Sequence, residues 1–241
     1  MNICAVIPAA GHGTRLGGDR PKILTPLTQT ETVWSVLHRK LAPLVDHIHL
    51  VLSPDGERQF TNPPQDVSYS VQSAPTGMGD AIFRGHAVWS NYDAILIVWG
   101  DQVFVSSDTL TRSIAALTGS GHQAVLPVTH MAIPYVEYVF EQDRLVRVLQ
   151  TREGDVTTPN GYSDVGTFLL TTDGLKRYWH DYLATAPRGS QTGEINFLPF
   201  LPFLSAQGWT ISPLEVKDAT EARGINTPDD LAFFRDLYKN A

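Results

Sequence analysis

The order of apolar segments along the chain constrains its fold more than any other feature of the sequence. Up to about residue 130, short apolar runs typical of buried strands alternate with segments whose apolar residues recur at the helical period. Parallel strands need long crossover connections, which are usually helices. The alternation therefore predicts an α/β fold with a mainly parallel sheet between layers of helices.

The later part of the chain predicts a change in the sheet. Between residues 134 and 171, strand-like runs follow one another without long helices, which indicates an antiparallel or mixed edge. No repeat or linker divides the 241 residues, so we predict a single domain over 1–241. The expected strands are 2–7, 46–52, 67–71, 94–98, 123–128, 136–141, 145–149, 165–171 and 209–216. The expected helices are 31–44, 78–90, 107–118, 172–185, 194–206 and 228–239, and the longest expected loops are 53–66, 151–164 and 186–193.

Composition excludes several classes of protein. Apolar residues make up 42% of the chain and charged residues 18%, which is ordinary for a soluble globular protein. The net charge of −7 argues against general binding of nucleic acid or anionic membranes. Cys4 is the only cysteine, so an internal disulfide is excluded, and no apolar run has the length of a membrane span. We expect a cytoplasmic protein without nucleic-acid or membrane partners.

The segment Ile7–Lys22, which follows the first expected strand, predicts a phosphate-binding loop. Glycines let the backbone turn and bring N–H groups against an anion, and basic side chains offset its charge. The glycine spacing differs from that of dinucleotide-binding loops, and the chain has no Gly-Lys-Ser/Thr sequence of a Walker A loop. The glycines and cations of this loop are Gly11, Gly13, Gly17, Gly18, Arg15, Arg20 and Lys22.

The sequence Gly11-His12-Gly13-Thr14-Arg15, followed by Pro21-Lys22, resembles the G-x-G-T-R-…-P-K signature of the nucleotidyltransferase (sugar-nucleotide pyrophosphorylase) family. The resemblance implies a Rossmann-like three-layer sandwich of the nucleotide-diphospho-sugar transferase type. It also implies that the loop wraps the phosphates of a nucleoside triphosphate, that Arg15 stabilises the departing pyrophosphate, and that Lys22 bridges the α-phosphate and the attacking phosphate. The nucleotide-binding residues implied in the loop are Ala9, Ala10, Gly11, Gly13 and Thr14.

A second segment, 71–81, resembles the Q-x(4)-G stretch of uridylyl- and thymidylyltransferases. The resemblance implies that the side chain of Gln72 and the backbone of Gly77 read a pyrimidine base, and an amide can both donate to and accept from uracil or thymine. Gly100 is assigned to the nucleotide as well. Met78 departs from the threonine common in N-acetylglucosamine-1-phosphate uridylyltransferases, which argues against that subgroup.

Two residues resemble the metal ligands of the family. Asp101 follows the buried run that ends in Val98-Trp99-Gly100, and Asn226 precedes the last expected helix. Mg²⁺ prefers oxygen ligands and substrate phosphates, so the resemblance implies a Mg²⁺ site at these two residues. Read locally, Asn226 or Thr227 is also a suitable N-cap, with Pro228 at the first helical position.

The sequence defines the residues that would bind the phosphorylated acceptor, which we call the acceptor side, less clearly than those for the nucleotide. Asp164 and Gly166 resemble an N/D-x-G strand that contacts the sugar in relatives, and Glu194 resembles the start of their G-E-x-x helix. Gln150 stands where sugar-binding members often carry glutamate, which leaves the acceptor open. Three cations are interpreted as solvated surface, with acceptor-phosphate binding as the alternative: Arg152, Arg188 and Lys217.

Together these observations predict an enzyme, a Mg²⁺-dependent nucleotidyltransferase that moves a nucleotidyl group from UTP or dTTP to a sugar 1-phosphate. The nucleotide part is expected over about 1–105 and the acceptor part over about 106–226. Two alternatives stay open: a cytidylyltransferase acting on a non-sugar alcohol phosphate, and a catalytically silent nucleotide-binding protein. The resemblance extends to the helix after Asn226 without a β-helix extension, so we expect one activity, and the sequence allows a homo-oligomer.

Overall fold

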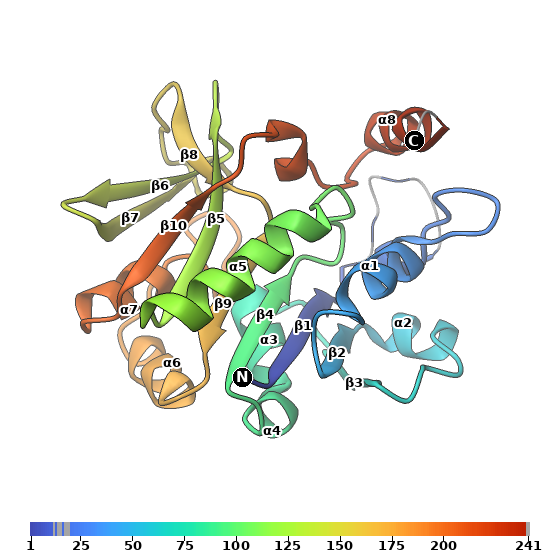
Figure 1. Ribbon diagram of the computed structural model, residues 1–241, viewed down its shortest axis with the longest axis horizontal. Coiled ribbons are helices and arrows are strands. Elements are labelled where there is room, and N and C mark those ends of the chain that lie inside the picture. The colour runs from blue at the N-terminus through green and yellow to red at the C-terminus, as the bar shows by residue number, and fades with distance from the viewer. Residues whose placement is uncertain (12, 14–15, 17–19, 240–241) are drawn as a thin grey trace.

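The computed structural model describes residues 1–11, 13, 16 and 20–239, and its ten strands form one sheet that crosses the whole molecule (Figure 1). The strand order is β3-β2-β1-β4-β9-β5-β8-β6-β7, and β10 pairs with β5. The strands are β1 (Ile3–Ala9), β2 (His47–Leu52), β3 (Val67–Val71), β4 (Ala94–Val98), β5 (Ala124–Met131), β6 (Val136–Glu141), β7 (Arg144–Gln150), β8 (Gly161–Asp164), β9 (Thr167–Thr171) and β10 (Ile211–Glu215).

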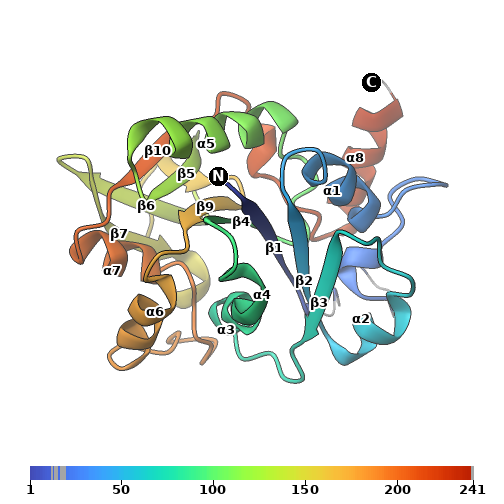
Figure 2. The same cartoon turned by 60° about the horizontal axis from the view of Figure 1, so that its bottom comes forward.

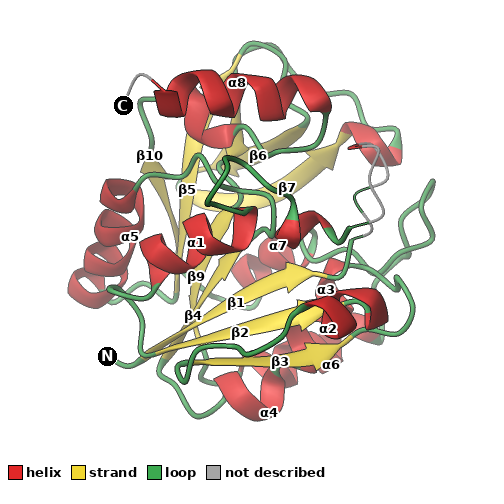
Figure 3. Ribbon diagram, turned by 90° about the vertical axis from the view of Figure 1, so that its right-hand side faces the viewer, coloured by secondary structure: helices red, strands yellow, loops and turns green. Residues whose placement is uncertain are grey.

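The direction of the strands follows the two sequence patterns. The first four strands are parallel, and Figure 3 shows β1, β2 and β3 pointing the same way. β9 then lies antiparallel between β4 and β5, and β6, β7 and β8 form antiparallel pairs at the far edge. The prediction of a mainly parallel mixed sheet with an antiparallel edge is confirmed.

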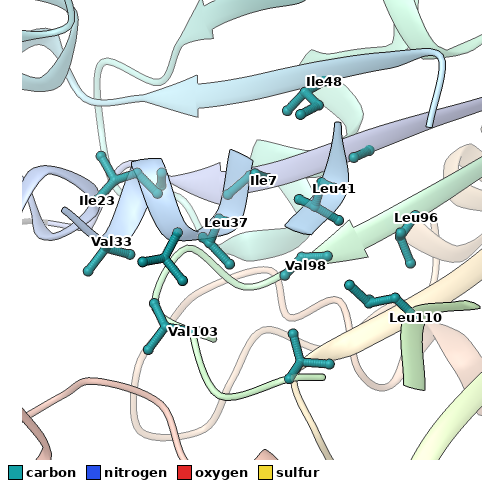
Figure 4. Close-up of a cluster of buried hydrophobic side chains, with 14 of the residues drawn as sticks. Ile7, Ile23, Val33, Leu37, Leu41, Ile48, Leu96, Val98, Val103 and Leu110 are labelled. Atoms are coloured by element: carbon teal, nitrogen blue, oxygen red, sulfur yellow. The ribbon is translucent and has the colours of Figure 1, made fainter. Parts of the chain in front are cut away.

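Helices cover both faces of the sheet, as Figure 2 shows. Alternation along β1 explains why: Ile3, Ala5 and Ile7 belong to the core under α1, α5 and α8, while Cys4 and Val6 belong to the core under α3, α4, α6 and α7. Figure 4 shows part of the first core. The helices are α1 (Val33–Leu41), α2 (Pro54–Gln59), α3 (Met78–Arg84), α4 (His86–Trp89), α5 (Ser107–Ser120), α6 (Leu175–Leu183), α7 (Phe200–Ala206) and α8 (Pro228–Lys239).

Several predicted boundaries are wrong. The expected helix 78–90 is two helices that meet at Gly85, where a side chain would strike the ring of His49. The expected helix 194–206 begins only at Phe200, because the backbone of Ile195 bonds to the neighbouring loop instead. The expected loops 53–66 and 151–164 contain α2 and β8, two elements too short to give a clear period.

Candidate functional site

A cleft of about 620 Å³ lies at the edge of the sheet where β1 and β4 end. Adjacent parallel strands bring their carboxyl ends to the same edge, which is where open α/β sheets bind ligands. The loop after β1 carries Lys22 in a short 3-10 helix, Lys22–Leu24, and the loop after β4 carries Asp101. Gly13 permits this packing because its φ is +60° and a Cβ there would lie 3.2 Å from Cβ of Lys22.

Lys22 meets both predicted metal ligands. Its Nζ donates hydrogen bonds to Oδ2 of Asp101 at 2.5 Å and to Oδ1 of Asn226 at 2.7 Å. The three residues are far apart in the sequence, yet these distances place one cationic nitrogen between two oxygens of different loops. A cluster of this kind in the lining of a cleft concentrates positive and negative charge beside the loop that is predicted to bind phosphates.

The position of Asn226 is fixed by the start of α8. Oδ2 of Asp230 accepts hydrogen bonds from the backbone N–H groups of Asn226 and Thr227 at 3.0 and 2.9 Å, and Oγ1 of Thr227 accepts from the N–H of Asp230 at 3.2 Å. Of the two predicted candidates, Thr227 is therefore the N-cap. The N–H of Ile225 also donates to the carbonyl of Asp101 at 2.9 Å, which ties the two loops together.

The oxygen atoms of Asp101 and Asn226 suit Mg²⁺. Both converge on the point that Nζ of Lys22 reaches, and one carboxylate and one amide oxygen leave most coordination positions to water and substrate phosphates, as Mg²⁺ prefers. Within the described residues, no group of three or more His, Cys, Asp or Glu side chains could hold a metal ion. His47 and His49, whose spacing could suit a metal, instead contact the hydroxyl of Ser68 at 2.7 and 2.8 Å.

The predicted base-reading residue, Gln72, is buried and lines the cleft. Its amide nitrogen is used within its own loop: it donates to Oδ2 of Asp80 at 2.9 Å, to the carbonyl of Gly77 at 3.1 Å and to Oγ1 of Thr76 at 3.2 Å. Burial alone would raise the pKa of Asp80, but hydrogen bonds from Gln72, Thr76 and Arg84 outweigh it and lower the pKa. The amide oxygen of Gln72 is thus the atom left for a base.

Gly77 joins this loop to the acceptor side. Its φ is +119°, and a Cβ there would lie 2.5 Å from the carbonyl oxygen of Ile195, so no other residue fits without movement. The N–H of Ile195 donates to the carbonyl of Thr76 at 3.0 Å. The segment around Ile195 therefore forms a wall that continues from the loop 72–79, which we call the base-reading loop after its predicted role.

Asp164 lies on the acceptor side with both carboxylate oxygens already engaged. The hydroxyl of Tyr138 donates to Oδ2 at 2.8 Å, and the N–H of Gly166 donates to Oδ1 at 2.7 Å. Burial raises the pKa of Asp164, and these hydrogen bonds partly offset that rise. Asp164 thus forms part of the cleft wall, and hydrogen bonds to both of its carboxylate oxygens offset part of the cost of burying it.

Gln150 and Glu194 complete the acceptor side. Gln150 is 8% exposed and lines the cleft, and its side-chain amide has no hydrogen-bond partner among the residues that the structure describes. Glu194 forms an ion pair with Arg152, with Nη2 and Oε1 2.8 Å apart. One prediction is wrong here: Glu194 does not start a helix, because its neighbour Ile195 bonds to the loop at Thr76. Arg152 is exposed, as interpreted from the sequence, and it also lines the cleft.

Every predicted site residue that the structure describes lines this one cleft. These residues are Ala9, Ala10, Gly11, Gly13, Lys22, Gln72, Gly77, Gly100, Asp101, Gln150, Asp164, Gly166, Glu194 and Asn226. Thr14 and Arg15 lie outside the described residues. The sequence analysis missed Trp99, Tyr135 and Asn196, which also line the cleft; Trp99 and Asn196 adjoin recognised motifs, whereas Tyr135 carries no signal in the sequence.

Comparison with solved structures confirms the fold. A UDP-glucose pyrophosphorylase complexed with UDP-glucose has a TM-score of 0.77 and 14% sequence identity, over 100% of this chain and 99% of that one. The inositol-1-phosphate CTP transferase from T. maritima has a TM-score of 0.73 and 18% identity, over 98% and 94% of the two chains. Both likenesses establish the architecture of a nucleotide-diphospho-sugar transferase. Across the part of the chain that is described, no helix combines the length and apolarity needed to cross a membrane.

Comparison of sequences identifies the family. The bifunctional protein GlmU of Aquifex aeolicus (strain VF5) is 25% identical over 254 residues, which cover 98% of this chain and 53% of GlmU. The chain thus spans about half the length of this relative. The family model for the MobA-like NTP transferase domain matches residues 5–162, which is more than half of the chain and includes the loop after β1, the base-reading loop and Asp101. The chain therefore belongs to the family of MobA-like NTP transferase domains.

Proposed function

We propose that the protein is an enzyme that transfers a nucleotidyl group from a nucleoside triphosphate, UTP or dTTP being favoured, to a sugar 1-phosphate and releases pyrophosphate. The main observation in support of this proposal is the convergence of Lys22, Asp101 and Asn226 in the lining of the cleft. The family supports a nucleoside triphosphate as donor, and the similarity to an inositol-1-phosphate CTP transferase and a UDP-glucose pyrophosphorylase supports a phosphorylated acceptor.

Such a transfer needs alignment and charge compensation more than a nucleophilic side chain. The acceptor phosphate is already ionised, so it can attack the α-phosphorus without a covalent enzyme intermediate. Lys22 would lie between the α-phosphate and the acceptor phosphate, and Arg15 would stabilise the pyrophosphate. Asp101 and Asn226 would hold Mg²⁺, which when bound would neutralise charge on the phosphates.

The remaining cleft residues divide by substrate in this proposal. The nucleotide would be held by Ala9, Ala10, Gly11, Gly13, Thr14, Gln72, Gly77 and Gly100. The acceptor would be held by Gln150, Asp164, Gly166 and Glu194. The proposed boundary between the nucleotide part, about 1–105, and the acceptor part, about 106–226, follows this division.

Pyrophosphate release with purified protein and Mg²⁺ tests the function. We expect Lys22→Ala and Asp101→Ala each to lower turnover at least about a hundredfold, the usual loss for one group that stabilises transition-state charge. Matched controls are Lys217→Ala and Asp108→Ala, whose side chains are exposed and outside the cleft, and these should retain wild-type turnover. Wild-type rates in either cleft variant would contradict the assigned roles.

A cytidylyltransferase acting on a non-sugar alcohol phosphate is the second candidate. Two observations favour it: Gln150 presents a neutral amide where sugar-binding relatives often have glutamate, and the amide oxygen of Gln72 could accept from the exocyclic amine of cytosine. A panel of UTP, dTTP, CTP, ATP and GTP against glucose 1-phosphate and inositol 1-phosphate separates the two. Triphosphate binding without turnover over a broad panel of acceptor phosphates would instead indicate a catalytically silent protein.

We further infer that the partners are small molecules, the nucleoside triphosphate and the acceptor phosphate, rather than nucleic acid or membranes, because the net charge is −7. A cytoplasmic location and a homo-oligomeric state belong to the same proposal. Fractionation of the source cells and light scattering of the purified protein measure them directly.

A further inference from the structure

The segment Gly189–Asn196, which we call the 189–196 segment, contacts both halves of the cleft. On one side it reaches the base-reading loop: the N–H of Ile195 donates to the carbonyl of Thr76 at 3.0 Å, and the N–H of Gly79 donates to the carbonyl of Ile195 at 3.3 Å. On the other side it places Glu194 and Asn196 in the lining of the cleft, to which Gln150 also belongs. One short segment thus joins the surfaces assigned to the two substrates.

The 189–196 segment needs an external anchor. It contains no helix or strand, and only Gly189, Gly193 and Glu194 bond to one another within it through the backbone. Segments with few buried apolar contacts open at low free-energy cost unless hydrogen bonds hold them. A positioning group outside the segment would therefore decide how well the cleft wall is formed before substrate arrives.

Glu153 supplies that anchor. Its Oε1 accepts hydrogen bonds from Oγ1 of Thr192 at 2.7 Å and from Nδ2 of Asn196 at 3.1 Å. Its Oε2 accepts from the N–H groups of Gln191 and Thr192 at 3.0 and 3.4 Å, and its carbonyl accepts from Oγ of Ser190 at 2.6 Å. One residue of the short 3-10 helix that follows β7, Thr151–Glu153, thus engages four residues of the segment: Ser190, Gln191, Thr192 and Asn196.

We propose that Glu153 is a positioning residue for nucleotidyl transfer: it holds the 189–196 segment in place, so that the base-reading loop and the acceptor wall are formed together before the substrates bind. Glu153 is not itself among the residues that line the cleft, so it acts through Ile195, Glu194 and Asn196. The inference rests on the proposed function for the identity of the substrates. It adds a residue that the family resemblance did not assign.

The surroundings of Glu153 fit a fixed anchor. A Cβ on Gly189 would lie 2.5 Å from its Oε1, so the backbone of the segment approaches the carboxylate closely. Burial slightly opposes ionisation, but the four hydrogen bonds outweigh it and lower the pKa of Glu153 to about 2. The carboxylate therefore stays ionised at working pH. The adjacent Arg152–Glu194 ion pair is partly exposed and adds a weaker tie to the same segment.

Hydrogen–deuterium exchange on the full chain tests the anchor without any need for turnover. We expect Glu153→Ala to speed exchange of the amides in 189–196 at least about tenfold, because their opening no longer breaks bonds to a carboxylate. The amide of Gly79, which donates to the carbonyl of Ile195, should also exchange faster. Glu141→Ala is the matched control, since Glu141 is an exposed glutamate of β6 whose side chain has no hydrogen-bond partner among the described residues. Unchanged exchange in Glu153→Ala would overturn the proposal.

Steady-state kinetics then separates positioning from a purely structural role. A loose segment weakens ground-state and transition-state binding equally, so Glu153→Ala should raise KM for both triphosphate and acceptor at least about fivefold and change kcat less than about threefold. Glu153→Gln keeps one acceptor oxygen and should give intermediate KM values. A lowered kcat at unchanged KM, or a lowered melting temperature at unchanged KM, would contradict the proposal. Failure of the wild type to release pyrophosphate from any pair of triphosphate and acceptor would refute the proposed function. The hydrogen–deuterium exchange result would still decide whether Glu153 holds the 189–196 segment.

Discussion

At the scale of single residues, the position of Lys22 sets the conditions for binding a cation. Its Nζ lies 2.5 Å from Oδ2 of Asp101 and 2.7 Å from Oδ1 of Asn226, the two oxygens proposed to hold Mg²⁺. A metal–oxygen distance of about 2.1 Å leaves no room for both cations on these oxygens. Without a triphosphate to attract Lys22, the ammonium group and the metal compete.

Mn²⁺, which takes similar oxygen ligands, measures this competition in the nucleotide-free protein. We expect Lys22→Met to bind Mn²⁺ at least about fivefold more tightly than wild type, since removal of a like charge at this distance is worth about 1 kcal/mol or more. Asp101→Asn should bind it more weakly. Electron paramagnetic resonance titration of free Mn²⁺ gives both affinities, with Lys217→Met as the control, and weaker binding by Lys22→Met would contradict the shared site.

The residues of the candidate site differ in how far the sequence could predict them. Lys22, Asp101 and Asn226 stand in short motifs that follow strands or precede a helix, so their place at one edge could be predicted. The partners of Gln72 and the role of Glu153 could not, because both depend on hydrogen bonds made by irregular loops. Such contacts leave no periodic pattern in the sequence.

At the scale of elements, the pairing of β2 with β3 creates a pH-sensitive contact in the sheet. His49 is 2% exposed, and its ring nitrogens contact the hydroxyls of Ser68 at 2.8 Å and Ser70 at 3.1 Å. Burial, together with a smaller effect of the neighbouring His47, lowers the pKa of His49 to about 4. The folded protein therefore holds this imidazole neutral.

Because the folded pKa lies below the unfolded value of about 6.5, the stabilisation is complete above pH 6.5 and is lost as pH falls toward 4. Between pH 7.5 and pH 5.0 we expect His49 to cost about 2 kcal/mol of unfolding free energy, from 1.36 kcal/mol per pH unit below 6.5. Urea unfolding at the two pH values measures the loss. His49→Gln, which does not titrate, should lose less unfolding free energy over the same interval. An equal loss would show that another group causes the pH dependence.

Elements with a strong period of apolar residues could be predicted from the sequence. Element boundaries that depend on tertiary contacts could not. β4 and the amphipathic α5 lie close to the expected ranges, and Ser106 caps α5 by accepting from the N–H of Thr109. α3 and α4 meet at Gly85, where a Cβ would lie 2.6 Å from the ring of His49. That contact joins residues on different elements, so the local pattern of the helix could not reveal it.

At the scale of the whole molecule, the proposed nucleotide and acceptor parts share their cores. On one face Leu50 and Ile48 pack in the same cluster as Val125 and Leu169, and on the other face Cys4 belongs to the cluster that contains Phe200 and Leu204. β9 also pairs with both β4 and β5, so the backbone ladder crosses the boundary near residue 105. The two parts can therefore bind different substrates and still fold as one unit.

This arrangement predicts one cooperative unfolding transition. Leu50→Ala in the nucleotide part and Leu204→Ala in the acceptor part each remove a fully buried side chain and should cost about 2–5 kcal/mol. Because the cores are shared, each variant should shift the urea midpoints of far-ultraviolet circular dichroism and tryptophan fluorescence together. Fluorescence reports on both parts, since Trp34 and Trp89 lie before residue 105 and Trp179 and Trp209 lie after it, and circular dichroism reports on the helices and strands of both. Separate midpoints in either variant would mean that the two parts unfold independently, and the cleft would then lie between two folding units that share one sheet.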